Sequence, residues 1–329
     1  MALNVLDFEK PIAELDANIA ELRRVSEEEG VDRSVEITEL EEHRDRLIEQ
    51  IFADLTPWDK TLLARHPRRP YTMDYIRIIF DDFIELHGDR LFADDNAIVG
   101  GTAFLNGKPA VVIGQQKGRD LKDRQFRNFG SAKPEGYRKA LRLMKMAEKF
   151  GCPIISFVDT PAADCSVGSE ERGISEAIAR NMRDMSIIKT PIVVMVSGEG
   201  GSGGAIGIAV GNKVLMQEHA IYSVIPPEGC AAILWRDPTK GAEAAEALKV
   251  TAQHAMKYGI IDEIVPEPLG GAHRNYEAAA ESVKDAIVRS LGELEKLPPD
   301  ELVEARYEKF RRMGVFRETS EEEAEAAEA

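Results

Sequence analysis

The chain has 329 residues, of which 43% are hydrophobic and 30% charged, a balance typical of a soluble globular protein with one large domain plus appendages. Its formal net charge is −16, and an acidic chain repels nucleic acid unless it carries a local basic patch. The cysteines, Cys152, Cys165 and Cys230, form no C-x-x-C pair, which argues against a disulfide framework and a structural zinc site. We therefore expect no metal in this chain.

Nothing in the sequence indicates a membrane segment. No apolar stretch approaches the length of a bilayer span, and the first residues, "MALNVLDFEK", lack the basic and apolar regions of a secretory signal. We therefore expect a cytoplasmic protein. At the other end, residues 318–329 carry six glutamates and no basic residue, and we interpret them as a solvated tail.

The first 60 residues have a helical pattern of their own. Apolar residues recur at spacings of three and four on both sides of a polar breaker, which predicts an antiparallel helical hairpin: Ile12, Leu15, Ile19 and Leu22, then Ile37, Leu40, Leu47 and Ile51. Two helices alone bury little surface, so the apolar stripe needs a cover. Either its own domain or a partner chain could provide that cover.

A proline- and arginine-rich segment, "ARHPRRPYTMDY", leads into a helix that we expect over 76–88. Residues 97–116 contain two strand-like runs around Asn106-Gly107, a strong hairpin signal. The basic stretch 117–127, "KGRDLKDRQFR", is a weak nucleic-acid signal because two aspartates interrupt it, and the phosphate of a small cofactor or an acidic partner fits as well.

From Pro134 onward, helices and strands alternate. A helix is expected from Pro134 to Gly151, and a second over 174–188. Apolar runs predict strands at 153–158, 191–196, 213–216 and 220–225. This order predicts an α/β fold with largely parallel strands, whose sites lie where strands run into helices.

The glycine-rich stretch 198–211 is the strongest local signal. Residues 198–203 match G-x-G-x-x-G, but the helix that follows is short, Glu218 is followed by a strand, and the lysine of a P-loop is absent. A nucleotide site is therefore disfavoured. Adjacent glycine N–H groups at a helix start suit a small developing oxyanion. The alternative is that the glycines only permit close packing of helix on strand.

Nine segments, in the same order, resemble the alpha subunit of the carboxyltransferase of bacterial multi-subunit acetyl-CoA carboxylase: "DFEKPIAEL", "ARHPRRPYTMDY", "GDRLFADDNAIVGG", "IGQQKGR", "PEGYRKALRLMKMAEKF", "EERGISEAIARN", "GEGGSGGA", "YSVIPPEGCAAILW" and "IIDEIVPEPLGGAHRN". The resemblance covers residues 4 to 276. It implies a crotonase-like ββα spiral over 61–290, preceded by the hairpin of 1–60 and followed by a C-terminal helix and acidic tail over 291–329.

The resemblance also implies an activity and partners. In that family, carboxyl transfer from carboxybiotin to acetyl-CoA gives malonyl-CoA, the committed step of fatty acid synthesis. Biotin arrives in trans on the biotin carboxyl carrier protein, after biotin carboxylase has loaded it. The beta subunit brings a zinc ribbon, most of the acetyl-CoA site and the oxyanion hole for the thioester, in an expected alpha2-beta2 assembly.

Residue by residue, the family pattern assigns the biotin oxyanion hole to the backbone N–H groups of Gly203 and Gly204. It places the substrate against Pro161, Ala162, Ala163, Gly201, Ser202, Lys117 and Arg119. For Lys117 and Arg119 we expect contact with CoA phosphates or with acidic groups of a partner, and a solvated surface loop is the alternative.

One segment departs from the family. Residues 159–168 read "DTPAADCSVG" where the family has D-T-P-G-A-Y-P-G-V-G, so two glycines, an aromatic ring and a proline are lost. Cys165, just before a helix expected from Ser169, is either an activated thiol or inert, and the adjacent Asp164 favours the inert interpretation. Two alternatives therefore stay open: a non-catalytic or substrate-altered paralogue, and a stand-alone acyl-CoA hydratase or isomerase, which would need a carboxylate base over the cleft.

Overall fold

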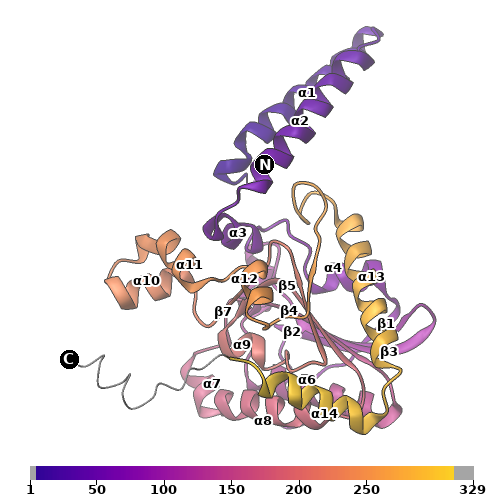
Figure 1. The fold of residues 1–329 in the computed structure, drawn as a ribbon, viewed down its shortest axis with the longest axis vertical. Helices are drawn as coiled ribbons and strands as arrows, with labels where there is room; N and C mark the ends of the chain where they lie inside the picture. The colour runs from indigo at the N-terminus through magenta and orange to yellow at the C-terminus, as the bar shows by residue number, and fades with distance from the viewer. Residues whose placement is uncertain (1–4, 315–329) are drawn as a thin grey trace, which may run out of the picture.

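A single mixed sheet organises the protein, a computed structural model of which describes residues 5–314 (Figure 1). The strands lie in the order β1-β2-β3-β4-β5-β6-β8, and β7 pairs with the end of β5. The bounds are β1 (Asp81–Glu85), β2 (Ile98–Leu105), β3 (Lys108–Gln115), β4 (Ile154–Thr160), β5 (Ile192–Gly201), β6 (Lys213–Gln217), β7 (Ile221–Ser223) and β8 (Glu263–Val265). The acidic tail expected from residue 318 lies outside the described residues.

Pairing in the sheet follows the predicted order. The strands β1, β2 and β3 are antiparallel, and all pairs from β3 onward are parallel. Asn106 and Gly107 both have positive φ, 50° and 76°, as a tight turn between twisted antiparallel strands requires. The hairpin between β2 and β3 is therefore confirmed, and so is the largely parallel character of the remaining sheet.

Helices cover both faces of the sheet. In β5, Ile192 and Val194 join the core under α6 (Pro134–Phe150) and α8 (Ile174–Ile187), whereas Val193 and Met195 join the core under α4 (Thr72–Ile79) and α13 (Tyr276–Leu294). This strict alternation follows from the period of two in a strand. Because both faces are buried, the parallel strands are apolar throughout.

The N-terminal helices project from this body. The helices α1 (Lys10–Glu29) and α2 (Ser34–Ala53) lie side by side and extend away from the sheet (Figure 1). Gly30 ends α1 in the left-handed conformation, with φ of 64°. Near the base, Ile12 and Ile48 are fully buried and Asp16 pairs with Arg274 of the main body at 2.7 Å.

The segment after α4 corrects one sequence expectation. A helix was expected over residues 76–88, but α4 ends at Ile79 and residues 81–85 form β1 instead. The backbone of Phe80 is already extended, and Asp81, Ile84 and Glu85 pair with β2. Pairing with the free edge of β2 outweighs the local apolar pattern, which is ambiguous between helix and strand at this length.

The remaining helices are short or terminal. They are η1 (Asp7–Glu9), α3 (Pro57–Ala64), α5 (Leu121–Phe126), η2 (Asn128–Gly130), α7 (Val167–Glu171), α9 (Ser202–Ile206), α10 (Pro227–Trp235), η3 (Pro238–Lys240), α11 (Gly241–Leu248), α12 (Ala252–Lys257) and α14 (Pro299–Arg311). Arg306 of α14 fixes that helix to the main body, because its buried guanidinium donates to the carbonyls of Met185 and Ile188. Within residues 5–314, no helix has the length and apolar content of a membrane span.

Candidate functional site

The candidate site begins where β5 runs directly into α9. All ten residues of β5 are buried, and Gly201 is both its last residue and the N-cap of α9. Ser202 turns the chain with a φ of 51°, a conformation uncommon for a residue with a side chain. The first N–H groups of a helix have no acceptor within that helix. The turn therefore presents the amides of Ser202, Gly203 and Gly204 as donors.

The glycines of this turn have different surroundings. A Cβ on Gly201 would lie 2.0 Å from the carbonyl oxygen of Pro161, and one on Gly204 would lie 2.6 Å from the carbonyl carbon of Ala162. A Cβ on Gly203 would meet its nearest atom, Cδ1 of Ile178, only at 3.5 Å. Gly203 is therefore open on the side where a Cβ would lie, whereas the backbone of residues 161–163 covers Gly201 and Gly204.

A cavity of about 620 Å³ adjoins this turn. Ser202 and Gly203 line it together with Tyr222, Tyr258 and Phe310, and most of the other lining side chains are aliphatic. Among the described residues of the lining, Lys249 is the charged one and there is no carboxylate. Burial raises the pKa of Tyr222 to about 12, so its hydroxyl stays neutral. The cavity suits a flat, largely apolar ligand with a polar group at the glycine turn.

The divergent loop 159–168 is ordered around Asp164. Its carboxylate accepts hydrogen bonds from Ser166 and Ser169 at 2.5 Å each and from the side-chain amide of Asn128 at 3.1 Å. Burial would raise the pKa of Asp164, but these hydrogen bonds lower it below its usual value. An ionised aspartate thus holds a loop that lacks the glycines and proline of the family pattern. Cys165 is exposed in this loop.

A buried ionic cluster supports the glycine turn from β4 and β5. The ammonium of Lys117 lies 2.7 Å from Asp159 and 2.8 Å from Glu199, and Nε of Arg65 lies 2.7 Å from the other oxygen of Glu199. Burial alone would lower the pKa of Lys117, but the charges of Asp159 and then Glu199 raise it above its usual value. Asp159 also accepts the backbone N–H of Glu199 at 2.9 Å. We call these four side chains the buried ionic cluster.

This arrangement bears on the expectation for Lys117 and Arg119, which stays a prediction. Two carboxylates surround the ammonium of Lys117, which argues against contact with a phosphate and against a solvated loop. Arg119 forms an ion pair with Asp74, donates to the carbonyls of Pro67 and Arg69, and lies 3.9 Å from the ring centre of Tyr71. Both side chains are held by this chain's own groups.

A second buried pair anchors the strand that leads to the site. Arg69 and Glu267 are fully buried and pair at 2.5 Å, and Nε of Arg69 donates to the carbonyl of Ser197 in β5. Burial would raise the pKa of Glu267, but Arg69 lowers it to about 2. Sequence patterns did not indicate these roles for Arg69 and Glu267, nor for Arg65, Asp159 and Glu199. The one available signal was the position of Asp159 and Glu199 at the ends of apolar strand runs.

Comparison with known proteins identifies relatives along almost the whole chain. A family model described as acetyl co-enzyme A carboxylase carboxyltransferase-like matches residues 5–314. Acetyl-coenzyme A carboxylase carboxyl transferase subunit alpha of Geobacter metallireducens is 57% identical over 313 residues, which cover 95% of this chain and 98% of the relative. The protein of the same name from Thermosynechococcus vestitus is 57% identical over 314 residues, 95% of this chain and 97% of the relative.

Solved structures of much lower identity share the fold. Transcarboxylase 12S aligns with a TM-score of 0.56 and 16% identity over 77% of this chain and 44% of its own. The beta subunit of geranyl-CoA carboxylase from P. aeruginosa aligns with a TM-score of 0.53 and 16% identity over 80% of this chain and 48% of its own. The crotonase-like α/β fold expected from the sequence is therefore confirmed. The chain belongs to the acetyl-CoA carboxylase carboxyltransferase family and is an alpha subunit of that transferase.

Proposed function

We propose that this carboxyltransferase alpha subunit moves the carboxyl group of carboxybiotin, carried on the carrier protein, to acetyl-CoA to give malonyl-CoA, and that the cavity beside Gly203 receives the biotin ring. The observation that carries the proposal is the open position of Gly203, whose amide lies in a helix start at the wall of a largely apolar cavity. A donor fixed in this way needs no reorganisation when negative charge develops on a nearby oxygen.

The residues present fit a biotin ring. Its bicyclic body is largely apolar, as is the lining of the cavity, and its one carbonyl oxygen needs a hydrogen-bond donor. When bound, carboxybiotin supplies an activated carboxyl group and, after transfer, a nitrogen able to take a proton. This chain's part is to orient that carbonyl with the amides of Gly203 and Gly204, while Ser202 fixes the turn and Gly201 lets it pack against Pro161.

In this proposal Gly204 contributes an amide donor and also packs against the loop that holds the turn in place. Its carbonyl accepts the side-chain amide of Gln115 at 2.9 Å and the hydroxyl of Tyr137 at 3.2 Å, so the peptide plane that follows the turn is fixed. The backbone of Ala162 and Ala163 lies directly against it. We therefore assign Gly203 as the residue whose environment is open to substrate, and Gly204 with residues 161–163 as the wall that holds the donors in place.

The proposal includes partners. A family member named as a subunit alpha works in a multi-subunit assembly, and here the beta subunit would supply the oxyanion hole for the acetyl-CoA thioester. We further propose an alpha2-beta2 core served by the biotin carboxyl carrier protein and biotin carboxylase, with the cytoplasm as its expected location. The projecting helices α1 and α2 would then be an arm that packs on a partner chain and is attached to its own domain near its base, where Asp16 pairs with Arg274.

A stand-alone hydratase or isomerase has less support. Such chemistry needs a carboxylate over the cleft, and among the described residues that line the cavity there is no aspartate or glutamate. Asp159 and Glu199 lie nearby, but Lys117 and Arg65 neutralise them in the buried ionic cluster. Because loop 159–168 departs from the family pattern, a non-catalytic paralogue is a second alternative, and the assay has to distinguish it from an active subunit.

The test is a reverse assay with purified subunits, in which malonyl-CoA is decarboxylated in the presence of free biotin. We expect turnover when the cognate beta subunit is added and none with the alpha chain alone, because each chain supplies one of two oxyanion holes. Comparable turnover by the alpha chain alone would contradict the two-chain proposal. A stable but inactive complex with beta would identify a non-catalytic paralogue.

A further inference from the structure

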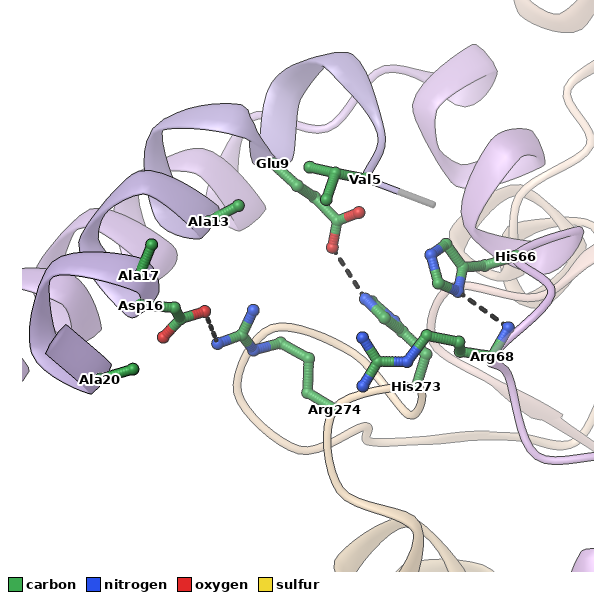
Figure 2. A pocket seen from close by; sticks show the side chains of 10 residues that line it. All are labelled: Val5, Glu9, Ala13, Asp16, Ala17, Ala20, His66, Arg68, His273 and Arg274. Carbon is green, nitrogen blue, oxygen red and sulfur yellow. Dashed lines mark hydrogen bonds and ion pairs between the residues drawn. The ribbon is translucent and has the colours of Figure 1, made fainter. Parts of the chain in front are cut away.

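Three side chains with metal-binding chemistry meet at the base of the N-terminal helices, away from the glycine turn. Glu9 is the last residue of η1, His66 follows α3, and His273 precedes α13. All three are buried, and one candidate ligand atom from each lies within 4.8 Å of the others. Figure 2 shows Glu9 bonded to His273, with His66 beside them at the wall of a cavity.

The contacts within this group are close. Nε2 of His273 lies 2.8 Å from a carboxylate oxygen of Glu9, and the imidazole rings of His66 and His273 have their centres 4.2 Å apart. The group thus brings one carboxylate and two imidazole rings into contact with one another.

We propose that Glu9, His66 and His273 form a binding site for a divalent transition metal ion of the zinc type. Two imidazoles and one carboxylate are a ligand set that zinc takes in proteins, with a fourth position for water. Bonds of about 2.0–2.1 Å place tetrahedral ligand atoms about 3.3 Å apart, so the present atoms need to move by roughly an ångström to close around an ion. Imidazole ligands favour zinc and its neighbours over magnesium or calcium.

The adjoining cavity gives an ion a route to this group. It has a volume of about 360 Å³, and the small side chains of Ala13, Ala17 and Ala20 on α1 form one wall. Arg68 and Arg274 also line it. Asp16 neutralises Arg274 at 2.7 Å, and Arg68 is an exposed residue whose charge water screens. The backbone N–H of Arg68 donates to Nδ1 of His66 at 3.2 Å, so an ion bound through that nitrogen would displace this hydrogen bond.

A bound ion would join two parts of the chain. Glu9 belongs to the segment that begins the projecting helices, whereas His66 and His273 belong to the main body. On binding, the proton of Nε2 of His273 is transferred through solvent to Nδ1 of the same ring, and the lone pair freed on Nε2 forms a metal–nitrogen bond in place of the N–H···O bond to Glu9. The metal binds the folded chain and not the scattered ligands of the unfolded one, so it should stabilise the attachment of α1. The cysteine pattern could not indicate such a site, because its ligands are a glutamate and two histidines that lie far apart in the sequence.

The test is a titration of the full-length, chelator-treated chain with Co²⁺, followed by visible absorption and equilibrium dialysis. We expect one Co²⁺ per chain, displaced by Zn²⁺. Glu9→Gln and His273→Gln should each weaken binding at least about tenfold, because each removes a ligand. The matched control is His43→Gln, an exposed histidine on α2, which should bind like the wild type.

Two further measurements make the result decisive. Zinc should raise the thermal midpoint of the wild-type chain by several degrees and leave Glu9→Gln unchanged. X-ray absorption of the Co²⁺-loaded wild type should show imidazole ligands, which needs no variant to fold. The site would be overturned if the wild-type chain formed no one-to-one complex with Co²⁺ or if the bound ion had no imidazole ligand. It would also be overturned if Glu9→Gln and His273→Gln bound Co²⁺ as tightly as the wild type.

Discussion

The ammonium of Lys117 lies 2.7 Å from a carboxylate oxygen of Asp159, at the centre of the buried ionic cluster beneath the glycine turn. A basic residue that the sequence placed in a loop open to phosphates is thus an internal support of the site. Because Glu199 shares the same ammonium, Lys117 ties the end of β4 to the end of β5. The distinction between an internal support and a phosphate contact can be measured.

Replacing Lys117 with Met should destabilise the fold. The variant leaves Asp159 buried without its ion pair and Glu199 with Arg65 as its remaining cation, and breaking a buried pair on one side costs about 3–5 kcal/mol. Arg119→Ala should cost less than Lys117→Met, because its ion pair with Asp74 is partly exposed. Urea unfolding measures both. A Lys117→Met chain of wild-type stability with a raised KM for acyl-CoA would restore the phosphate role.

The pair of Arg69 and Glu267 predicts an acid-sensitive stability. The pKa of Glu267 falls from an ordinary value of 4.5 to about 2 on folding, so the stabilisation is complete above the unfolded value and is lost as pH falls through the folded one. Urea midpoints of the wild type should therefore decrease between pH 4.5 and pH 2. Glu267→Gln should be less stable at neutral pH and show a shallower decrease over that range. Parallel pH profiles of the two chains would contradict this assignment.

Cys165 should be accessible and dispensable. It is exposed in loop 159–168, whereas Cys230 is buried, so a maleimide should label Cys165 faster than Cys230. Cys165→Ser should keep full carboxyl transfer with the beta subunit, because the thiol is exposed and does not line the cavity beside Gly203. Mass spectrometry of the labelled chain gives the order of reaction. Loss of turnover in Cys165→Ser, with the complex intact, would identify the thiol as functional.

Local patterns predicted the features of the fold that depend on local chemistry. Asn106-Gly107 specified a turn, and the apolar run at 191–196 specified the strand that the structure shows as β5. The error at residues 81–85 arose because Phe83 and Ile84 fit a helix or a strand, and only the edge of β2 decides between them. A partner strand distant in sequence is not visible in a local pattern.

The candidate site also has some features that local sequence indicates and others that depend on residues distant in the chain. Gly203 could be proposed from the sequence because adjacent glycines between a strand and a helix start indicate free N–H donors. The partners of Lys117 were not found, because Asp159 and Glu199 meet it only when three strands come together in the sheet. The same reason hid the cluster of Glu9, His66 and His273. Charge pairing across a fold depends on topology, which periodicity does not supply.

The glycine turn gives the last prediction, because its two central glycines should respond differently to the same change. Gly203→Val should fold, since its Cβ meets nothing closer than 3.5 Å, and its side chain should occupy the space next to the amide. Turnover with the beta subunit should then fall by about 10²-fold or more, as when an oxyanion donor is lost. Gly204→Val should instead lose stability, by about 1–3 kcal/mol or more, because its Cβ would overlap the carbonyl carbon of Ala162.

The matched control is Gly292→Val in α13, where a Cβ would meet nothing within 4 Å, and both stability and turnover should stay near wild type. The measurements are kcat for carboxyl transfer, thermal unfolding and association with the beta subunit for all three variants. A nucleotide site would instead give saturable ATP or NAD binding to the wild-type chain. A folded, assembled Gly203→Val enzyme with wild-type turnover would reject the oxyanion role, because the side chain then fills the approach to the amide without consequence.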